Sequence, residues 1–216
     1  MTKYKLFIDG EYRDALSGQT ANSLNPFNGD IYATVHQAGI EDANAAIESC
    51  YTAFQDWKDL LPSAREALFL KAADVMTARG DELRDVLIDE GGSTMIKAGY
   101  ETHHAPDFLR GMAGECRRVT GETYVSNYVG VRSYSVRRPM GVVTAIAPFN
   151  FPLLLAIRKI GWAIAAGNCV VLKPSEATPV IGLKIAEIFT EAGFPPGVLN
   201  VLPAQGADLG ETLITH

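Results

Sequence analysis

Hydrophobic and polar positions change period several times along the chain. Residues 4–15 hold two short apolar segments around Asp9-Gly10, a favoured two-residue turn, and so predict a β-hairpin. Between residues 41 and 58, apolar residues recur at three- and four-residue steps, which is the period of one buried helical face. The same period predicts further helices near 64–79, 81–90 and 95–117.

The second half of the chain alternates between apolar strands and helices. From residue 142 the apolar runs are "VVTAIA", "CVVLK" and "VLNVL", which are typical of parallel strands buried on both faces. The helix expected from Pro152 to Ala166 is apolar nearly all round and is therefore predicted to be buried. Strands and helices that alternate at this spacing indicate a parallel sheet, so the predicted fold class is α/β.

Residues 121–138 interrupt this order with alternating Tyr, Val and Ser residues. They predict two extended strands joined near Asn127 to Gly130. Both faces of this ribbon carry polar groups. We therefore expect it to protrude and to pack on a partner rather than on its own core.

Polar residues mark where two of the helices should begin. Ser63 and Glu66 match a capping box, in which the serine side chain accepts from the glutamate N–H and the glutamate reaches back. Thr178 is the expected N-cap of the helix that follows the second strand, with Pro179 in its first position.

Composition and charge exclude several classes of function. The chain is 47% hydrophobic and 20% charged, as in globular proteins, and its net charge of -6 does not favour nucleic acid as a partner. The sequence shows neither a signal-peptide core nor an uninterrupted membrane span. Three scattered cysteines indicate a reduced chain, so we expect a cytoplasmic protein. His103 and His104 are helix neighbours that point about 100° apart, so no metal site is predicted.

Three short segments follow the ends of the three expected parallel strands. They cover residues 148–150, 173–176 and 203–206, and ligands of open parallel sheets bind at this edge. Lys173 offers a positive charge, and Glu176 can accept from both hydroxyls of a ribose. The fingerprint G-x-G-x-x-G is absent. The residues by themselves therefore predict an α/β domain with a nucleotide-binding edge and go no further.

Two longer stretches resemble the aldehyde dehydrogenase superfamily. They are "GVVTAIAPFNFPLLLAIRKIGWAIAAGNCVVLKPSEATPV" and "EAGFPPGVLNVLP", and the likeness extends over the whole chain. The resemblance implies an atypical Rossmann-like parallel sheet that binds NAD or NADP without the glycine fingerprint. It implies a cofactor-binding domain made of residues 1–120 and 139–216. It also implies a bridging ribbon at 121–138 that joins copies into a dimer or tetramer.

The resemblance assigns roles to particular residues. Asn150 matches the asparagine whose amide stabilises the oxyanion, although its residue type also suits a cap on the helix that begins at Pro152. Lys159 matches a family lysine that lies near the reacting groups. The alternative is that Lys159 is an ordinary buried or partly ion-paired lysine without a role in the reaction. Glu176 should repel a 2′-phosphate and so favours NAD over NADP. The implied cofactor contacts are Ile146, Ala147, Pro148, Phe149, Lys173, Ser175, Glu176, Gly206 and Gly210.

The implied reaction oxidises an aldehyde to a carboxylic acid through a cysteine thiohemiacetal and thioester. Cys50, Cys116 and Cys169 do not match that nucleophile, which the resemblance places beyond His216 together with the catalytic domain. We therefore expect this chain alone to be inactive and marginally soluble. The alternatives are a non-catalytic nucleotide-binding or assembly module and an acylating semialdehyde dehydrogenase. The sequence does not specify the aldehyde.

Overall fold

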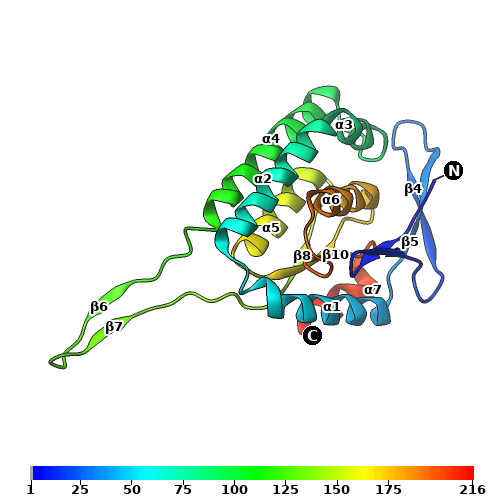
Figure 1. Ribbon diagram of the computed structural model, residues 1–216. Coiled ribbons are helices and arrows are strands. Elements are labelled where there is room, and N and C mark those ends of the chain that lie inside the picture. Colours follow the sequence, from blue (N-terminus) through cyan, green and yellow to red (C-terminus); the bar gives the residue numbers. More distant parts are fainter. Residues whose placement is uncertain (1) are drawn as a thin grey trace.

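A computed structural model describes residues 2–216 as helical layers around a central sheet, with a separate small sheet and a protruding ribbon (Figure 1). The strands are β1 (Thr2–Tyr4), β2 (Leu6–Ile8), β3 (Glu11–Arg13), β4 (Thr20–Leu24), β5 (Ile31–His36), β6 (Thr123–Val125), β7 (Arg132–Tyr134), β8 (Val142–Ile146), β9 (Cys169–Lys173) and β10 (Leu199–Val201). The helices are α1 (Ile40–Trp57), α2 (Pro62–Ala78), α3 (Gly80–Asp89), α4 (Met95–Glu115), α5 (Pro152–Ala165), α6 (Pro179–Ala192) and α7 (Gly206–Thr215).

The central sheet has five strands in the order β3-β2-β10-β9-β8. Strands β8, β9 and β10 are parallel, as predicted, and β9 is buried along its whole length between them. The predicted hairpin is also present, with Asp9 and Gly10 both at positive φ in its turn. Its first strand pairs antiparallel with β10. The N-terminal hairpin thus covers one edge that a three-stranded sheet would expose.

Helices cover both faces of the sheet. Helices α1 and α7 pack together on one face, whereas α5 and α6 lie on the other beneath α2, α3 and α4 (Figure 1). Helix α5 is largely buried, as predicted, except for an exposed stripe formed by Arg158, Lys159 and Trp162. Among residues 2–216, no helix has both the length and the apolar composition that crossing a membrane requires.

One predicted helix start is wrong, and another is confirmed without its expected side-chain cap. Helix α2 begins at Pro62 rather than after Ser63, so Ser63 lies inside the first turn and the capping box is wrong. Proline suits this first helical position because its φ is fixed and its missing N–H would have no helical partner. Thr178 does occupy the N-cap of α6, yet its side chain makes no capping hydrogen bond. Both helices therefore obtain their first turns without the local cap that the sequence suggested.

The ribbon of β6 and β7 extends away from the body of the molecule (Figure 1). Its strands pair antiparallel, with Thr123 opposite Tyr134, and all six strand residues are exposed. The prediction of a protruding two-stranded ribbon is confirmed. Strands β1, β5 and β4 form the other small sheet, beside the central one.

Candidate functional site

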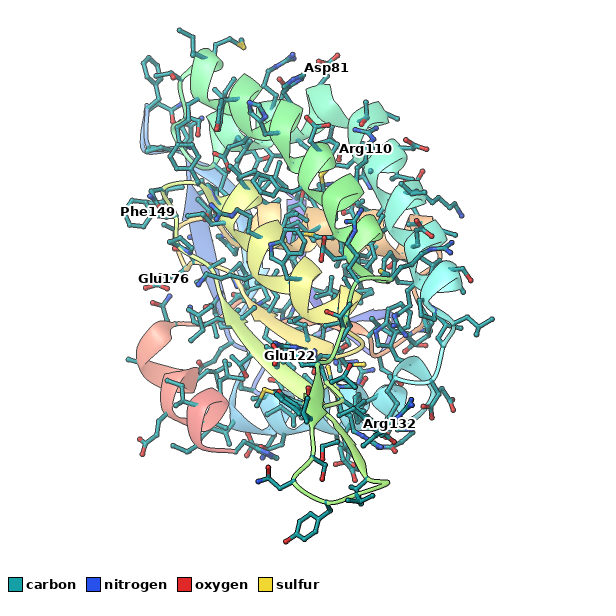
Figure 2. The ribbon with its side chains drawn as sticks, turned by 90° about the vertical axis from the view of Figure 1, so that its left-hand side faces the viewer. Asp81, Arg110, Glu122, Arg132, Phe149 and Glu176 are labelled. Atoms are coloured by element: carbon teal, nitrogen blue, oxygen red, sulfur yellow. The ribbon has the colours of Figure 1, made fainter. Side chains whose placement is uncertain are left out.

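The carboxyl ends of β8 and β9 meet at one edge of the central sheet. Ile146 lies opposite Lys173 in the register, and the Ala147 N–H donates to the Lys173 carbonyl at 2.9 Å. Just beyond the strands, Phe149 and Glu176 line one shared hollow. Figure 2 shows both on the same side of the molecule, with α7 below them. Two of the three predicted segments therefore converge, and the helix that follows the third lies on the same side.

Lys173 is a buried cation at this edge. Its side chain is only 3% exposed, and its ammonium donates to the Glu176 carboxylate at 3.1 Å and to the Pro174 carbonyl at 3.2 Å. A hydrogen bond from its own backbone N–H and the neighbouring Lys173 lower the pKa of Glu176. Ser175 is buried, and its hydroxyl accepts from the Ala177 N–H within the turn. The edge therefore presents a fixed, ionised carboxylate of the kind that binds ribose hydroxyls.

Asn150 is exposed, and the structure gives its side chain no hydrogen-bond partner within residues 2–216. The interpretation of Asn150 as a helix cap is wrong, because Phe151 occupies the N-cap position of α5. The backbone N–H groups of Leu153 and Leu154 donate instead to the carboxylate of Glu101, each at 3.1 Å. The amide of Asn150 is left free to donate to a ligand.

Lys159 projects from the exposed stripe of α5, nine residues after Asn150. Lys159 itself lies about two helical turns after Pro152, the first residue of α5. The structure does not bring it to the Lys173–Glu176 edge, so a role in the chemistry stays a prediction. Its neighbour Arg158 stacks over the Phe108 ring at 5.3 Å.

The remaining predicted cofactor contacts surround the same edge. Ile146 is exposed and Ala147 is buried, while Pro148 is half-buried between them and Phe149. Gly206 and Gly210 lie at the start and middle of α7, where an added Cβ would meet nothing within 4 Å. The packing of this chain therefore does not require glycine at either position. Free N–H groups in the first turn of α7 favour an anionic ligand.

Sequence reasoning missed two buried glutamates that cap the helices at this edge. Glu101 of α4 caps α5, and Glu90 at the end of α3 caps α6 by accepting from the N–H groups of Val180 and Ile181. A hydroxyl hydrogen bond from Ser23 completes the contacts of Glu90. The available signal was a glutamate on the apolar face of a helix: Glu101 falls three and four residues from Ala98 and Ala105, which are both buried.

The cysteines and the paired histidines offer no comparable chemistry. Burial raises the pKa of Cys116 to about 11 and that of Cys169 to about 12, so both thiols stay protonated at neutral pH. The expectation that His103 and His104 point apart is wrong, since their ring centroids lie 5.0 Å apart and possible ligand atoms of both lie near Asp107. However, the Asp107 carboxylate already accepts from Arg110 at 3.2 Å. That no metal binds here stays a prediction.

The family model described as the aldehyde dehydrogenase family matches residues 12–216. The chain belongs to the aldehyde dehydrogenase family. The match confirms the resemblance inferred from the sequence motifs. The α/β architecture with its parallel strands is consistent with that family.

Known members of the aldehyde dehydrogenase family resemble the chain along nearly its whole length. Phenylacetaldehyde dehydrogenase from Pseudomonas fluorescens is 40% identical over 99% of this chain and 44% of its own length. D-glyceraldehyde dehydrogenase (NADP(+)) from Picrophilus torridus is 35% identical over 98% of this chain and 43% of its own. The structure of an NAD-dependent benzaldehyde dehydrogenase from Corynebacterium glutamicum superposes with a TM-score of 0.94 at 36% identity, covering 99% of this chain and 47% of that one. The chain thus spans less than half the length of these relatives.

Proposed function

We propose that this chain supplies the cofactor-binding edge and one oxyanion donor of an NAD(P)-dependent enzyme that oxidises an aldehyde to a carboxylic acid. The observation that carries the proposal is the free amide of Asn150, one residue from Phe149, which lines the same hollow as Glu176. The names of the relatives, one dependent on NAD and another on NADP, support the cofactor class.

The residues at the edge fit a dinucleotide. Glu176, ionised and tethered by Lys173, can accept from ribose hydroxyls, and Phe149 lines the same hollow. In this proposal Ile146, Ala147, Pro148 and Phe149 form the wall on the nicotinamide side. The start of α7, with Gly206 and Gly210, offers backbone N–H groups on the adenine side. Bound NAD(P) supplies the hydride acceptor. Because a 2′-phosphate would meet the Glu176 carboxylate, we expect NAD to bind more tightly than NADP.

Asn150 acts on the substrate in this proposal. Its amide donates to the aldehyde oxygen as that oxygen gains negative charge, and losing one such donor typically costs about 2.7–4 kcal/mol of transition-state stabilisation. The nucleophilic cysteine and the glutamate that activates water belong to the family's other segments. Lys159 stays a candidate for a supporting charge near the reaction.

A chimaera tests this function directly. The chain would be joined to the part of the Pseudomonas fluorescens relative that the match leaves uncovered, and aldehyde-dependent NADH formation would be measured. We expect turnover, and we expect Asn150→Ala to lower kcat by about 10²–10³-fold while leaving NAD affinity nearly unchanged. Asn44→Ala, at an exposed asparagine of α1, is the matched control. Equal kcat for both variants would disprove the role of Asn150.

The same assay separates the two alternatives. A non-catalytic module binds NAD without turnover even in the chimaera. An acylating enzyme needs coenzyme A or phosphate to release its product. For the ribbon of residues 121–138, the proposed role is to join copies of the chain into a dimer or tetramer, which the exposure of its apolar residues supports.

A further inference from the structure

Helix α4 contacts the segment that carries Asn150, which runs from the end of β8 to the first turn of α5. Glu101 of α4 is fully buried, and one of its oxygens accepts from the N–H groups of Leu153 and Leu154 at 3.1 Å. Its other oxygen accepts from the Lys97 ammonium at 2.7 Å. Both carboxylate oxygens are therefore used, and the positive charge of Lys97 compensates the negative charge at the start of α5.

The same helix also holds the residue after Asn150. The Lys97 ammonium lies 4.7 Å from the centroid of the Phe151 ring, and the Tyr100 ring approaches Phe151 edge-on at 6.4 Å. At the other end of the turn, Ala147 is hydrogen-bonded to Lys173 of β9. Only five residues, two of them prolines, lie between Ala147 and the capped Leu153. Few backbone conformations are open to Asn150 between them.

We propose that Glu101, held by Lys97, is a positioning residue for Asn150; this inference rests on the proposed function. Asn150 lies next to Phe151, the N-cap residue of α5, and its side-chain carbonyl is an acceptor of the kind that caps helix N–H groups. Because Glu101 accepts from Leu153 and Leu154, these N–H groups do not need the Asn150 carbonyl, and the Asn150 amide stays available. Without Glu101, the Leu153 and Leu154 N–H groups would compete for the Asn150 carbonyl and turn the amide away from the substrate.

The variant that tests this is Glu101→Gln. Glutamine keeps the shape but has only one acceptor oxygen, so its NH2 group must face either the Lys97 ammonium or the two N–H donors of α5. The matched control is Glu90→Gln, since Glu90 also accepts from two consecutive helix N–H groups, one on each carboxylate oxygen, but caps α6 instead of α5. Both substitutions replace one buried carboxyl group with an amide and weaken one helix cap.

A double-mutant cycle in the chimaera distinguishes positioning from general support. We expect E101Q to lower kcat about tenfold when Asn150 is present and less than about twofold in the N150A background, because coupled residues are not additive. E90Q should change kcat by the same factor in both backgrounds. Equal losses from E101Q in both backgrounds would overturn the inference while leaving the proposed function intact.

An inactive wild-type chimaera would count against the proposed function instead, and a second measurement then decides the inference. In the ¹⁵N-labelled 216-residue chain, the side-chain NH2 signals of Asn150 should shift in E101Q and stay in place in E90Q. Asn150 signals that do not respond to E101Q would refute the positioning role, whatever the activity.

Discussion

Glu90 and Glu101 show how single buried charges determine the geometry of the site. Each is at most 3% exposed and accepts from two backbone N–H groups at a helix start. A buried carboxylate without partners would be strongly disfavoured, whereas charge-assisted hydrogen bonds to helix N–H groups offset that penalty. These two carboxylates provide the caps that the N-cap residues Phe151 and Thr178 do not supply through their own side chains, and they join α3 and α4 to the sheet helices.

The titration of Glu90 predicts a pH dependence of stability. Burial raises its pKa from the usual 4.5 to about 7, although the N–H groups of Val180 and Ile181 oppose this shift. Between these two values the folded state binds the proton more tightly than the unfolded state. The free energy of unfolding should therefore fall as pH rises, by up to about 1.4 kcal/mol per pH unit.

Urea unfolding at pH 5, 6, 7 and 8 measures this contribution. The wild-type chain should be less stable at pH 8 than at pH 5, and Glu90→Gln should remove most of that difference. Glu41→Gln, at an exposed residue of α1, serves as the control for a general loss of charge. A pH slope that survives in E90Q would mean that other groups cause it.

Close approach of α4 and α5 depends on one glycine. A Cβ added to Gly161 would lie 2.0 Å from the sulfur of Met112 and 2.9 Å from its terminal methyl carbon. Met112 is completely buried, so it has little room to move aside. This crossing also keeps Glu101 within reach of the first turn of α5.

Gly161→Ala should therefore destabilise the chain by about 1–3 kcal/mol through overpacking. The control is Gly99→Ala, in α4, where an added Cβ would meet nothing within 4 Å. That change should stabilise the chain by about 0.5–1 kcal/mol, because alanine is the better helix former. Denaturant unfolding gives both values, and equal effects of the two substitutions would show that the crossing is looser than described.

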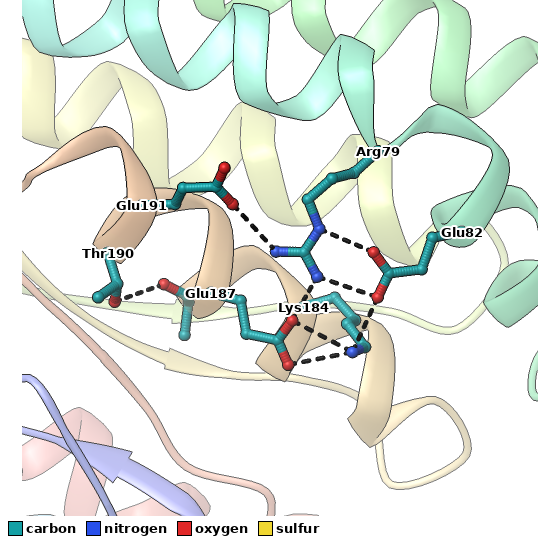
Figure 3. Close-up of polar contacts among 7 residues, drawn as sticks. Arg79, Glu82, Lys184, Glu187, Thr190 and Glu191 are labelled. Atoms are coloured by element: carbon teal, nitrogen blue, oxygen red, sulfur yellow. Dashed lines mark hydrogen bonds and ion pairs between the residues drawn. The ribbon is translucent and has the colours of Figure 1, made fainter.

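A network of charges joins α3 to α6 (Figure 3). Arg79 donates to Glu82 at 2.7 Å and also to Glu187, while the Lys184 ammonium lies 2.9 Å from Glu82 and 3.1 Å from Glu187. The hydrogen bond from Arg79 is the main reason that the pKa of Glu82 falls to about 2. Arg79 pairs with three carboxylates of this network, those of Glu82, Glu187 and Glu191.

Arg79→Met should cost about 1 kcal/mol of stability, since partly exposed ion pairs contribute little individually. Arg84→Met is the matched control, because within residues 2–216 Arg84 pairs only with the exposed Asp81 and Asp85 on its own helix. Its effect should be close to zero. In 1 M NaCl the difference between the two variants should shrink through screening. A salt-independent loss in R79M would indicate lost packing instead.

The ribbon of β6 and β7 carries apolar side chains that no other part of residues 2–216 covers. Val125 is 99% exposed and Val129 is fully exposed, with Tyr128 and Tyr134 also largely open to solvent. Apolar residues gathered in this way are typical of protein–protein contacts. Oligomerisation through the ribbon would bury them without altering the central sheet.

The double variant Val125→Asp/Val129→Asp should therefore lower the molar mass of the particle in light scattering. The control is Phe27→Asp, which places a charge at a residue that is 94% exposed but lies in the loop between β4 and β5. It should leave the mass unchanged. If the ribbon variant keeps the wild-type mass, the ribbon does not join the copies.

Local patterns were sufficient for most elements of the fold. Asp9-Gly10 specified the hairpin turn because both positions need positive φ, and short apolar runs specified β8 and β9. Burial on both faces holds for β9, whereas that prediction is wrong for β8, which is largely half-buried because it lies at the edge of the sheet. The motif around Asn150 and the Lys173–Glu176 pair indicated the family and the edge. For these features the determining contacts lie within a few residues of sequence.

Tertiary structure alone decided which groups complete the site. Glu101 and Leu153 are 52 residues apart, and Glu90 and Val180 are 90 apart, so no local pattern connects them. The same holds for β2, which pairs with β10 across most of the chain. The sequence by itself determined the elements and their polar ends, because those follow from neighbouring residues. Only the packed structure showed that the buried glutamates cap the helices and leave Asn150 free.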